Sequence, residues 1–161
     1  MSKFKYTKDK PLKVCTLCSG YDSQAMSLEE LGIPFELVVW SEIDKYACQA
    51  HDAVYPQWAE RNVGDMTKVD WTKCPDFDLL TYSTPCQDIS TAGKQAGLIE
   101  GSDTRSSIIW YTKHAIQEKK PKFFLAENVS GMLADRHSKA VENIVSLFDE
   151  CGYDVTINLV N

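Results

Sequence analysis

Short apolar runs alternate along the chain with longer segments in which apolar residues recur at helical spacing. The runs that predict strands lie at residues 12–18, 35–40, 62–66, 77–82, 122–127 and 153–159. The segments that predict helices lie at residues 24–31, 45–54, 106–118 and 137–151. Repeated alternation of strand and helix is typical of βαβ units, so we expect an α/β fold with a mostly parallel sheet and helices on both faces.

The length and composition are those of one domain with a tail. The chain has 161 residues, of which 43% are hydrophobic, and we assign residues 1–11 to an N-terminal tail and residues 12–161 to the domain. No apolar run approaches the roughly eighteen residues of a membrane helix, and the lysine-rich start has no apolar signal region. We therefore expect a cytoplasmic protein that has no membrane partner.

The cysteines predict free thiols. Most of the six lie inside predicted strands and helices, not in a loop-rich framework, which indicates a reducing compartment. Cys15 and Cys18 form a C-x-x-C pair, but no second pair lies at zinc-ligand spacing and the pair falls on a predicted strand. We expect no metal site.

The charge argues against strong nucleic-acid binding by this chain alone. The net charge is -6 and the isoelectric point is near 5.0. Neutralising phosphates needs clustered Lys and Arg side chains. A basic surface that reads nucleic acid would therefore belong to another region or another chain.

Three predicted strand ends carry residues suited to a nucleoside, and ligands of open parallel sheets bind at such ends. Gly20 allows a ligand to approach a helix N-terminus, although an ordinary turn has the same pattern. Glu42 is able to accept hydrogen bonds from ribose hydroxyls, whereas Asp44 is better explained as a helix-start carboxylate. Asp65 suits an adenine amino group and Met66 suits its ring, with a turn aspartate as the alternative.

Two further strand ends carry reactive groups. Pro85 rigidifies a turn that presents Cys86, and a thiolate at such a position is a strong nucleophile. Glu127 ends an apolar strand, where we expect a buried carboxyl group suited to proton transfer. A lone cysteine is usually structural and a lone glutamate usually solvated, so the residues alone leave both interpretations open.

The motif pair Pro85-Cys86-Gln87 and Glu127-Asn128-Val129 resembles that of the C5-cytosine DNA methyltransferases, in order and in spacing. The likeness extends over residues 12–161. Other matching segments are Leu17-Cys18-Ser19-Gly20 for the first cofactor loop, Glu42 for the ribose, Gly64-Asp65 for the adenine, and Thr104-Arg105-Ser106 at the start of the next helix.

The resemblance implies a Rossmann-like methyltransferase fold that uses S-adenosylmethionine and releases S-adenosylhomocysteine. It implies that Cys86 adds to C6 of a cytosine flipped out of the duplex, while Glu127 hydrogen-bonds the ring nitrogen edge. C5 then accepts the methyl group, a base removes the C5 proton and Cys86 leaves. Such enzymes serve DNA methylation in restriction, phage protection or regulation.

The resemblance also implies a set of site residues. The catalytic residues are Cys86, Glu127 and Arg105. The cofactor-binding residues are Cys18, Ser19, Gly20, Tyr21, Asp22, Ser23, Glu42, Ile43, Asp65, Met66, Thr84 and Pro85. The substrate-binding residues are Gln87, Ser90 and Asn128.

The cofactor loop departs from the family pattern. The family usually has an acid in the first strand, followed by several glycines or hydrophobic residues. This chain has Thr16 in the strand and Tyr21, Asp22 and Ser23 in the loop. We expect the amino-acid end of the cofactor to be held differently, with Asp22 as a candidate contact for its ammonium group.

A second departure concerns length. The family continues with an arginine-rich strand motif, a target-recognition domain and a final helix, none of which follows Asn161. We expect a fragment or half of a split enzyme that is inactive alone, meets double-stranded DNA through the missing region and pairs with a complementary chain or C-terminal half. A non-catalytic cofactor-binding or partner-binding remnant and a tRNA cytosine-5 methyltransferase remain alternatives. Exposed apolar surface would favour self-association.

Overall fold

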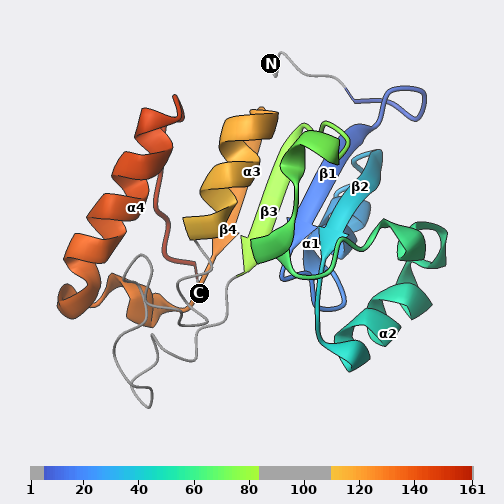
Figure 1. Ribbon diagram of the computed structural model, residues 1–161, viewed down its shortest axis with the longest axis horizontal. Helices are drawn as coiled ribbons and strands as arrows, with labels where there is room; N and C mark the ends of the chain where they lie inside the picture. Colours follow the sequence, from blue (N-terminus) through green and yellow to red (C-terminus); the bar gives the residue numbers. More distant parts are fainter. Residues whose placement is uncertain (1–5, 84–109, 161) are drawn as a thin grey trace. The chain divides into compact units, whose positions relative to one another are not determined.

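The computed structural model describes residues 6–83 and 110–160, which fall into two compact units (Figure 1). The first unit is described over residues 6–83 and 119–126, and the second over residues 110–118 and 127–160. No helix among these residues has the length and apolar character needed to cross a membrane.

A four-stranded sheet forms the first unit, in the order β2-β1-β3-β4 (Figure 1). Its strands are β1 (Leu12–Leu17), β2 (Phe35–Ser41), β3 (Leu79–Ser83) and β4 (Phe123–Glu127, whose last residue belongs to the second unit). β1 pairs in parallel with both β2 and β3, so that Thr16 lies opposite Trp40 on one side and Thr81 on the other. This pairing confirms the predicted α/β class and parallel sheet.

The core forms where the central strand is covered on both faces. Five of the six residues of β1 are buried, as expected for a parallel strand between two neighbours. Leu12, Val14, Leu37 and Trp40 make one apolar cluster within this core. Each such side chain contributes about 1.5–3 kcal/mol by leaving water.

Two capped helices follow the first two strands. α1 (Ser23–Glu30) begins after Asp22, and α2 (Lys45–Val54) begins after Asp44. The Asp44 carboxylate accepts hydrogen bonds from two backbone amides of the first turn of α2, which confirms its predicted role at the helix start. Three short 3-10 turns then lead to β3: η1 (Pro56–Arg61), η2 (Met66–Lys68) and η3 (Trp71–Lys73).

The second unit is helical in its described part. It contains α3 (Thr112–Lys119, whose last residue belongs to the first unit), η5 (Ser130–Leu133), η6 (Asp135–His137) and α4 (Ser138–Glu150). α4 buries Ile144, Leu147 and Phe148. Ile144 and Phe148 belong to the helical spacing expected from the sequence, whereas Leu147 was not part of it. Gly152 ends it with a positive φ of 88°, and its amide donates to the Asp149 carbonyl at 2.8 Å.

Two predicted strands are not present. In the segment 62–66, a single parallel bridge joins Asn62 to Trp40 before the chain turns into η2. The segment 153–159 has no regular structure, and its Ile157 and Leu159 side chains are exposed. An alternating pattern forms a strand only if another strand pairs with it, and no described strand does so here. The predicted helix at 106–118 is described only from residue 110 onward, with α3 beginning at Thr112.

Candidate functional site

The loop between β1 and α1 contains an unusual left-handed turn. Cys18, Gly20 and Asp22 have φ values of 52°, 57° and 69°. For residues with a side chain, such a conformation costs about 1 kcal/mol or more, so surrounding contacts must hold Cys18 and Asp22 in place. No atom lies within 4 Å of the position that a Cβ on Gly20 would take, so the glycine serves the backbone angle and leaves open space beside the loop.

The Asp22 side chain supplies part of that support from inside the protein. It is fully buried, and its Oδ2 accepts a hydrogen bond of 2.8 Å from Thr16 Oγ1. Its Oδ1 accepts one of 3.1 Å from the Ala25 amide, which caps α1. The Ser19 hydroxyl lies 2.9 Å from Thr16 Oγ1. An ammonium group has no access to this carboxylate, so Asp22 supports the loop instead of contacting a ligand.

Glu42 joins this loop to the end of β2. Its Oε2 accepts a hydrogen bond of 3.0 Å from the Gly20 amide, and its Oε1 accepts from the Ile43 and Asp44 amides at 2.8 and 2.9 Å. Asn62 holds the Glu42 backbone, because its side-chain amide donates to the Glu42 carbonyl and accepts from the Glu42 N–H. The sequence interpretation missed Asn62, whose signal was a polar side chain in a segment predicted as strand.

The turn after Gly64 is the third segment of the candidate site, beside the loop after β1 and the end of β2. Asp65 Oδ1 accepts from both the amide and the hydroxyl of Thr67, and Lys68 Nζ lies 3.0 Å from Oδ2. These contacts, chiefly the hydrogen bond from the Thr67 hydroxyl, hold the pKa of Asp65 below its usual value. Met66 is buried, and its sulfur lies 3.9 Å from Cys18 Sγ.

Contacts therefore bring together the three predicted nucleoside-binding segments of the first unit. The Gly20–Glu42 and Cys18–Met66 contacts link them, and Ile43 remains 74% exposed beside Glu42. Tyr21 and Ser23 are also exposed, whereas Ser19 is buried. The arrangement offers a half-buried carboxylate, held by the Gly20 amide, and an exposed apolar side chain, which suit the polar and apolar parts of a nucleoside.

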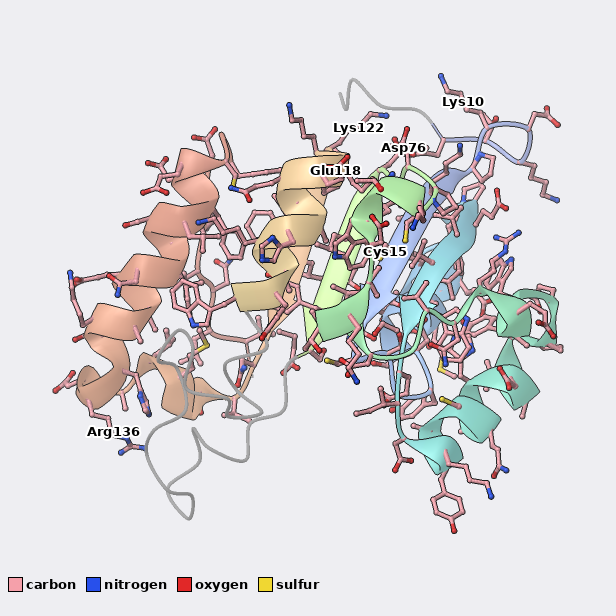
Figure 2. The ribbon with its side chains drawn as sticks, in the orientation of Figure 1. Lys10, Cys15, Asp76, Glu118, Lys122 and Arg136 are labelled. Carbon is pink, nitrogen blue, oxygen red and sulfur yellow. The ribbon has the colours of Figure 1, made fainter. Side chains whose placement is uncertain are left out.

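The cysteines of this unit are not activated thiols. Burial, reinforced by the charge of Glu42, raises the pKa of Cys18 to about 11. Burial also raises the pKa of Cys15, which lies within β1 (Figure 2). Cys15, Cys18, Cys48, Cys74 and Cys151 carry free thiols. The described residues contain no cluster of three or more potential metal ligands.

A shallow hollow of about 250 Å³ lies elsewhere, where the chain enters the strands. Lys10, Asp76 and Lys122 are among its lining residues (Figure 2). Its charges are largely paired, since Lys119 contacts Asp76 and Lys122 contacts Asp78. The hollow has none of the predicted site residues in its wall.

Six predicted site residues lie between positions 84 and 109, outside the described residues. They are Thr84, Pro85, Cys86, Gln87, Ser90 and Arg105. The structure does describe Ser83, the last residue of β3, whose hydroxyl accepts a hydrogen bond of 2.7 Å from Gln24 Nε2 of α1. Gln24 therefore links α1 to the point where the Pro85-Cys86 segment begins, a role that the sequence interpretation missed.

The expected burial of Glu127 is wrong. Glu127 is the last residue of β4 and is exposed, as are most residues of that strand. β4 ends the strand order among the described residues, so it has a described neighbour on one side only. Asn128 is half-buried, and its side-chain oxygen accepts from the Val129 amide at 2.8 Å.

Comparisons with known proteins agree on one family. The family model of the C-5 cytosine-specific DNA methylases matches residues 12–161. The chain is 37% identical over 150 residues to the orphan methyltransferase M.SPRI of Bacillus phage SPR, covering 93% of this chain and 34% of that protein. It is 38% identical over 152 residues to the type II methyltransferase M.NgoPII of Neisseria gonorrhoeae, covering 94% of this chain and 43% of that protein.

Solved structures show the same fold. The S. pombe Dnmt2 methyltransferase has a TM-score of 0.61 at 18% identity, over 85% of this chain and 40% of that one. A protein described as a DNA modification methyltransferase of an E. coli prophage has a TM-score of 0.63 at 23% identity, over 86% of this chain and 38% of that one. The predicted Rossmann-like methyltransferase fold is confirmed. The chain spans less than half the length of each of these relatives.

Proposed function

The chain belongs to the C-5 cytosine-specific DNA methylase family, and from this premise we propose that it carries the cofactor site and the nucleophile of a DNA (cytosine-5)-methyltransferase. The observation that carries the proposal is the hydrogen bond from the Gly20 amide to Glu42, which joins two strand ends into one polar site. In the sequence, Pro85-Cys86-Gln87 follows β3 of the same sheet after one intervening residue. Nucleoside cofactors bind such sheets at the carboxyl ends of their strands.

The residues at these strand ends fit S-adenosylmethionine. The Glu42 carboxylate would accept hydrogen bonds from the ribose hydroxyls, and the exposed Ile43 side chain would cover a face of the adenine. Asp65 would accept from the adenine amino group, with Met66 packed behind it. The open space beside Gly20 leaves room for the amino-acid end. When bound, the cofactor supplies the methyl group that C5 of cytosine accepts.

We assign the covalent steps to two residues of this chain. The Cys86 thiolate adds to C6 of a flipped cytosine and forms a C–S bond, which moves electron density to C5. Glu127, exposed at the end of β4, would hydrogen-bond the ring nitrogen edge of the base and orient it. After C5 is methylated, a base removes its proton, the C–S bond breaks and the thiolate is released.

The remaining assignments concern the substrate. Gln87 and Ser90 would shape the segment that covers the base, together with Asn128, and Arg105 would orient the base or a nearby phosphate. The acidic chain would meet double-stranded DNA through a further region, such as the part of its longer relatives that this chain does not match. We also propose that the chain acts in the cytoplasm, as expected from a sequence with no apolar signal region.

A second candidate is a non-catalytic cofactor-binding module. The buried Asp22 favours it, because this residue stands where the family usually has a glycine or an apolar residue in the loop. In that case the site would bind S-adenosylmethionine without transferring its methyl group.

Transfer of a labelled methyl group from S-adenosylmethionine to mixed-sequence DNA tests the proposal. The chain would be assayed alone and fused to the remaining region of a relative such as M.NgoPII. Cys86→Ser should abolish incorporation, whereas Cys151→Ser, a matched change at another free thiol, should leave it within about twofold. Cofactor binding without transfer in any form would favour the non-catalytic module. A chain that binds no S-adenosylmethionine would overturn both candidates.

A further inference from the structure

A fully buried pair beside the cofactor loop has no part in the proposed chemistry. Asp22 and His51 are both 0% exposed, and His51 Nε2 lies 3.4 Å from Asp22 Oδ2. We propose that His51 is a positioning residue for the cofactor site, whose imidazole acts through Asp22 to fix the left-handed turn that presents the Gly20 amide. This inference rests on the proposed function, because it concerns the same site.

The charge of Asp22 requires a partner of this kind. A carboxylate removed from water is strongly destabilising unless hydrogen bonds and an opposite charge or a strong donor compensate it. Thr16 and Ala25 donate one hydrogen bond each. His51 is the basic residue that the described structure places within 4 Å of this carboxylate.

The buried His51 imidazole in turn needs hydrogen-bond partners for its ring nitrogens. Neither of its ring nitrogens has a hydrogen bond of good geometry among the described residues. The nearest acidic oxygens are Asp22 Oδ2 and, 3.9 Å from Nδ1, Asp52 Oδ1. Buried polar groups are rarely left without partners, so we assign the Nε2 proton to Asp22, which a small rotation of the ring would bring into hydrogen-bonding geometry.

The position of the imidazole is fixed by the sheet. Its ring stacks on Trp40 of β2 with centroids 3.7 Å apart and an angle of 14°, and Tyr55 lies against it at 5.7 Å. His51 belongs to α2, whose first turn is capped by Asp44 two residues after Glu42. The same helix therefore connects the Glu42 side of the site to the Asp22 side.

This connection explains how an interior residue controls a surface amide. Cys18 and Asp22 have positive φ values, a strained conformation that persists only under outside restraint. If Asp22 loses its buried partner, the turn is free to relax. Relaxation would move the Gly20 amide away from Glu42. The Glu42 carboxylate, the polar centre of the cofactor site, would then lose one of the contacts that hold it in place.

The test compares His51→Phe with Leu37→Val. Phenylalanine keeps an aromatic ring on Trp40 but loses both nitrogens, so a role in packing alone would tolerate it. Leu37→Val is a buried control in the core cluster, away from the loop. In the unliganded chain, amide hydrogen exchange at residues 19–25 should accelerate at least tenfold in His51→Phe and less than twofold in Leu37→Val.

Calorimetric titration with S-adenosylmethionine supplies the second readout. The dissociation constant should rise at least tenfold in His51→Phe, and Asp22→Asn should give a similar loss that the double variant does not deepen. Asp22→Asn also serves if His51→Phe does not fold. Unchanged exchange and affinity in His51→Phe, beside a wild-type chain that binds, would overturn the inference and leave the proposed function standing. A wild-type chain that does not bind would overturn the proposed function, while the exchange rates would still decide whether His51 holds the loop.

Discussion

The Gly20 amide donates a 3.0 Å hydrogen bond to Glu42 Oε2, so the loops that follow β1 and β2 share one carboxylate. The other oxygen of Glu42 accepts from the Ile43 and Asp44 amides. A side chain expected to contact a ribose therefore also sets the geometry of its own site. Its substitution should affect cofactor binding in two ways, through lost contacts and through a displaced loop.

We expect Glu42→Gln to weaken S-adenosylmethionine binding by about 10-fold and Glu42→Ala by more. Hydrogen bonds to a charged group contribute about 1.5–3 kcal/mol, and glutamine retains one acceptor oxygen that alanine lacks. Calorimetric titration measures both constants. Glu30→Gln, at an exposed position of α1, is the control and should bind like the wild type. Equal affinity in all four proteins would contradict the ribose assignment.

Cys18 should react with iodoacetamide only slowly at pH 8. Burial and the charge of Glu42 raise its pKa to about 11, and the thiolate that reacts is present only as the pH approaches that value. The rate measured by mass spectrometry should therefore rise about tenfold for each pH unit from 8 to 10. Glu42→Gln removes the negative charge and should increase the rate at pH 8, whereas Glu30→Gln should not. A rate independent of pH would refute this.

The free energy of unfolding should fall at acid pH in part because Asp65 loses its hydrogen bond with Thr67 when it is protonated. The pKa of Asp65 is lowered mainly by the Thr67 hydroxyl, so its ionised form stabilises the fold above the unfolded pKa of about 3.9. That stabilisation is lost as the pH falls through the lower folded value. Thr67→Val should raise the Asp65 pKa in a carboxyl NMR titration and reduce the stability lost between pH 5 and pH 2.

A matched control for Asp65 exists a few residues away. Asp70 pairs with Lys73 and accepts from Thr72 in the same pattern, and these contacts, the one with Lys73 first, lower its pKa to about 2. Thr72→Val should raise the Asp70 pKa without changing S-adenosylmethionine affinity. A loss of S-adenosylmethionine affinity in Thr72→Val would contradict this expectation.

Gln24→Ala should destabilise the chain by about 1 kcal/mol, the usual value of a partly buried hydrogen bond. Ser83→Ala removes the other partner of the same contact and should cost a similar amount, and the double variant little more. Urea unfolding measures each change, with Gln57→Ala at an exposed position as the control. Because Ser83 lies two residues before Pro85 in the segment that leads to Cys86, both changes should lower methyl transfer more than cofactor affinity. Additive losses in the double variant would mean that the contact is not formed in solution.

Periodicity predicted the first half of the fold well. The helix expected at 45–54 has those bounds in the structure, and β1 and β2 begin at the predicted residues. These elements carry both an apolar pattern and clear stop signals. The segment 153–159 carries only the alternation, and without a described partner strand its apolar residues remain exposed.

The grouping of the candidate site residues was predictable from the sequence, but their individual contacts were not. Strand ends identified Gly20 and Glu42 because a parallel sheet brings its carboxyl ends to one edge. Asp65 follows a segment predicted as strand, of which only the bridge between Asn62 and Trp40 forms. The Asp22 side chain points into the protein because its backbone adopts a left-handed conformation, and the sequence pattern does not predict that conformation. His51 is distant from Asp22 in the sequence and lies in an ordinary helical pattern. Their contact could therefore not be predicted from the sequence.

The inward-facing carboxylate of Asp22 limits what can be exchanged between members of this family. Thr16, Asp22 and His51 come from a strand, a loop and a helix, yet they meet at one buried point. A graft of residues 18–23 from a relative with glycine at this position would leave the hydroxyl and the imidazole facing an empty space. A graft that keeps the loop intact should therefore carry all three residues together, including His51, which lies well outside the loop in the sequence.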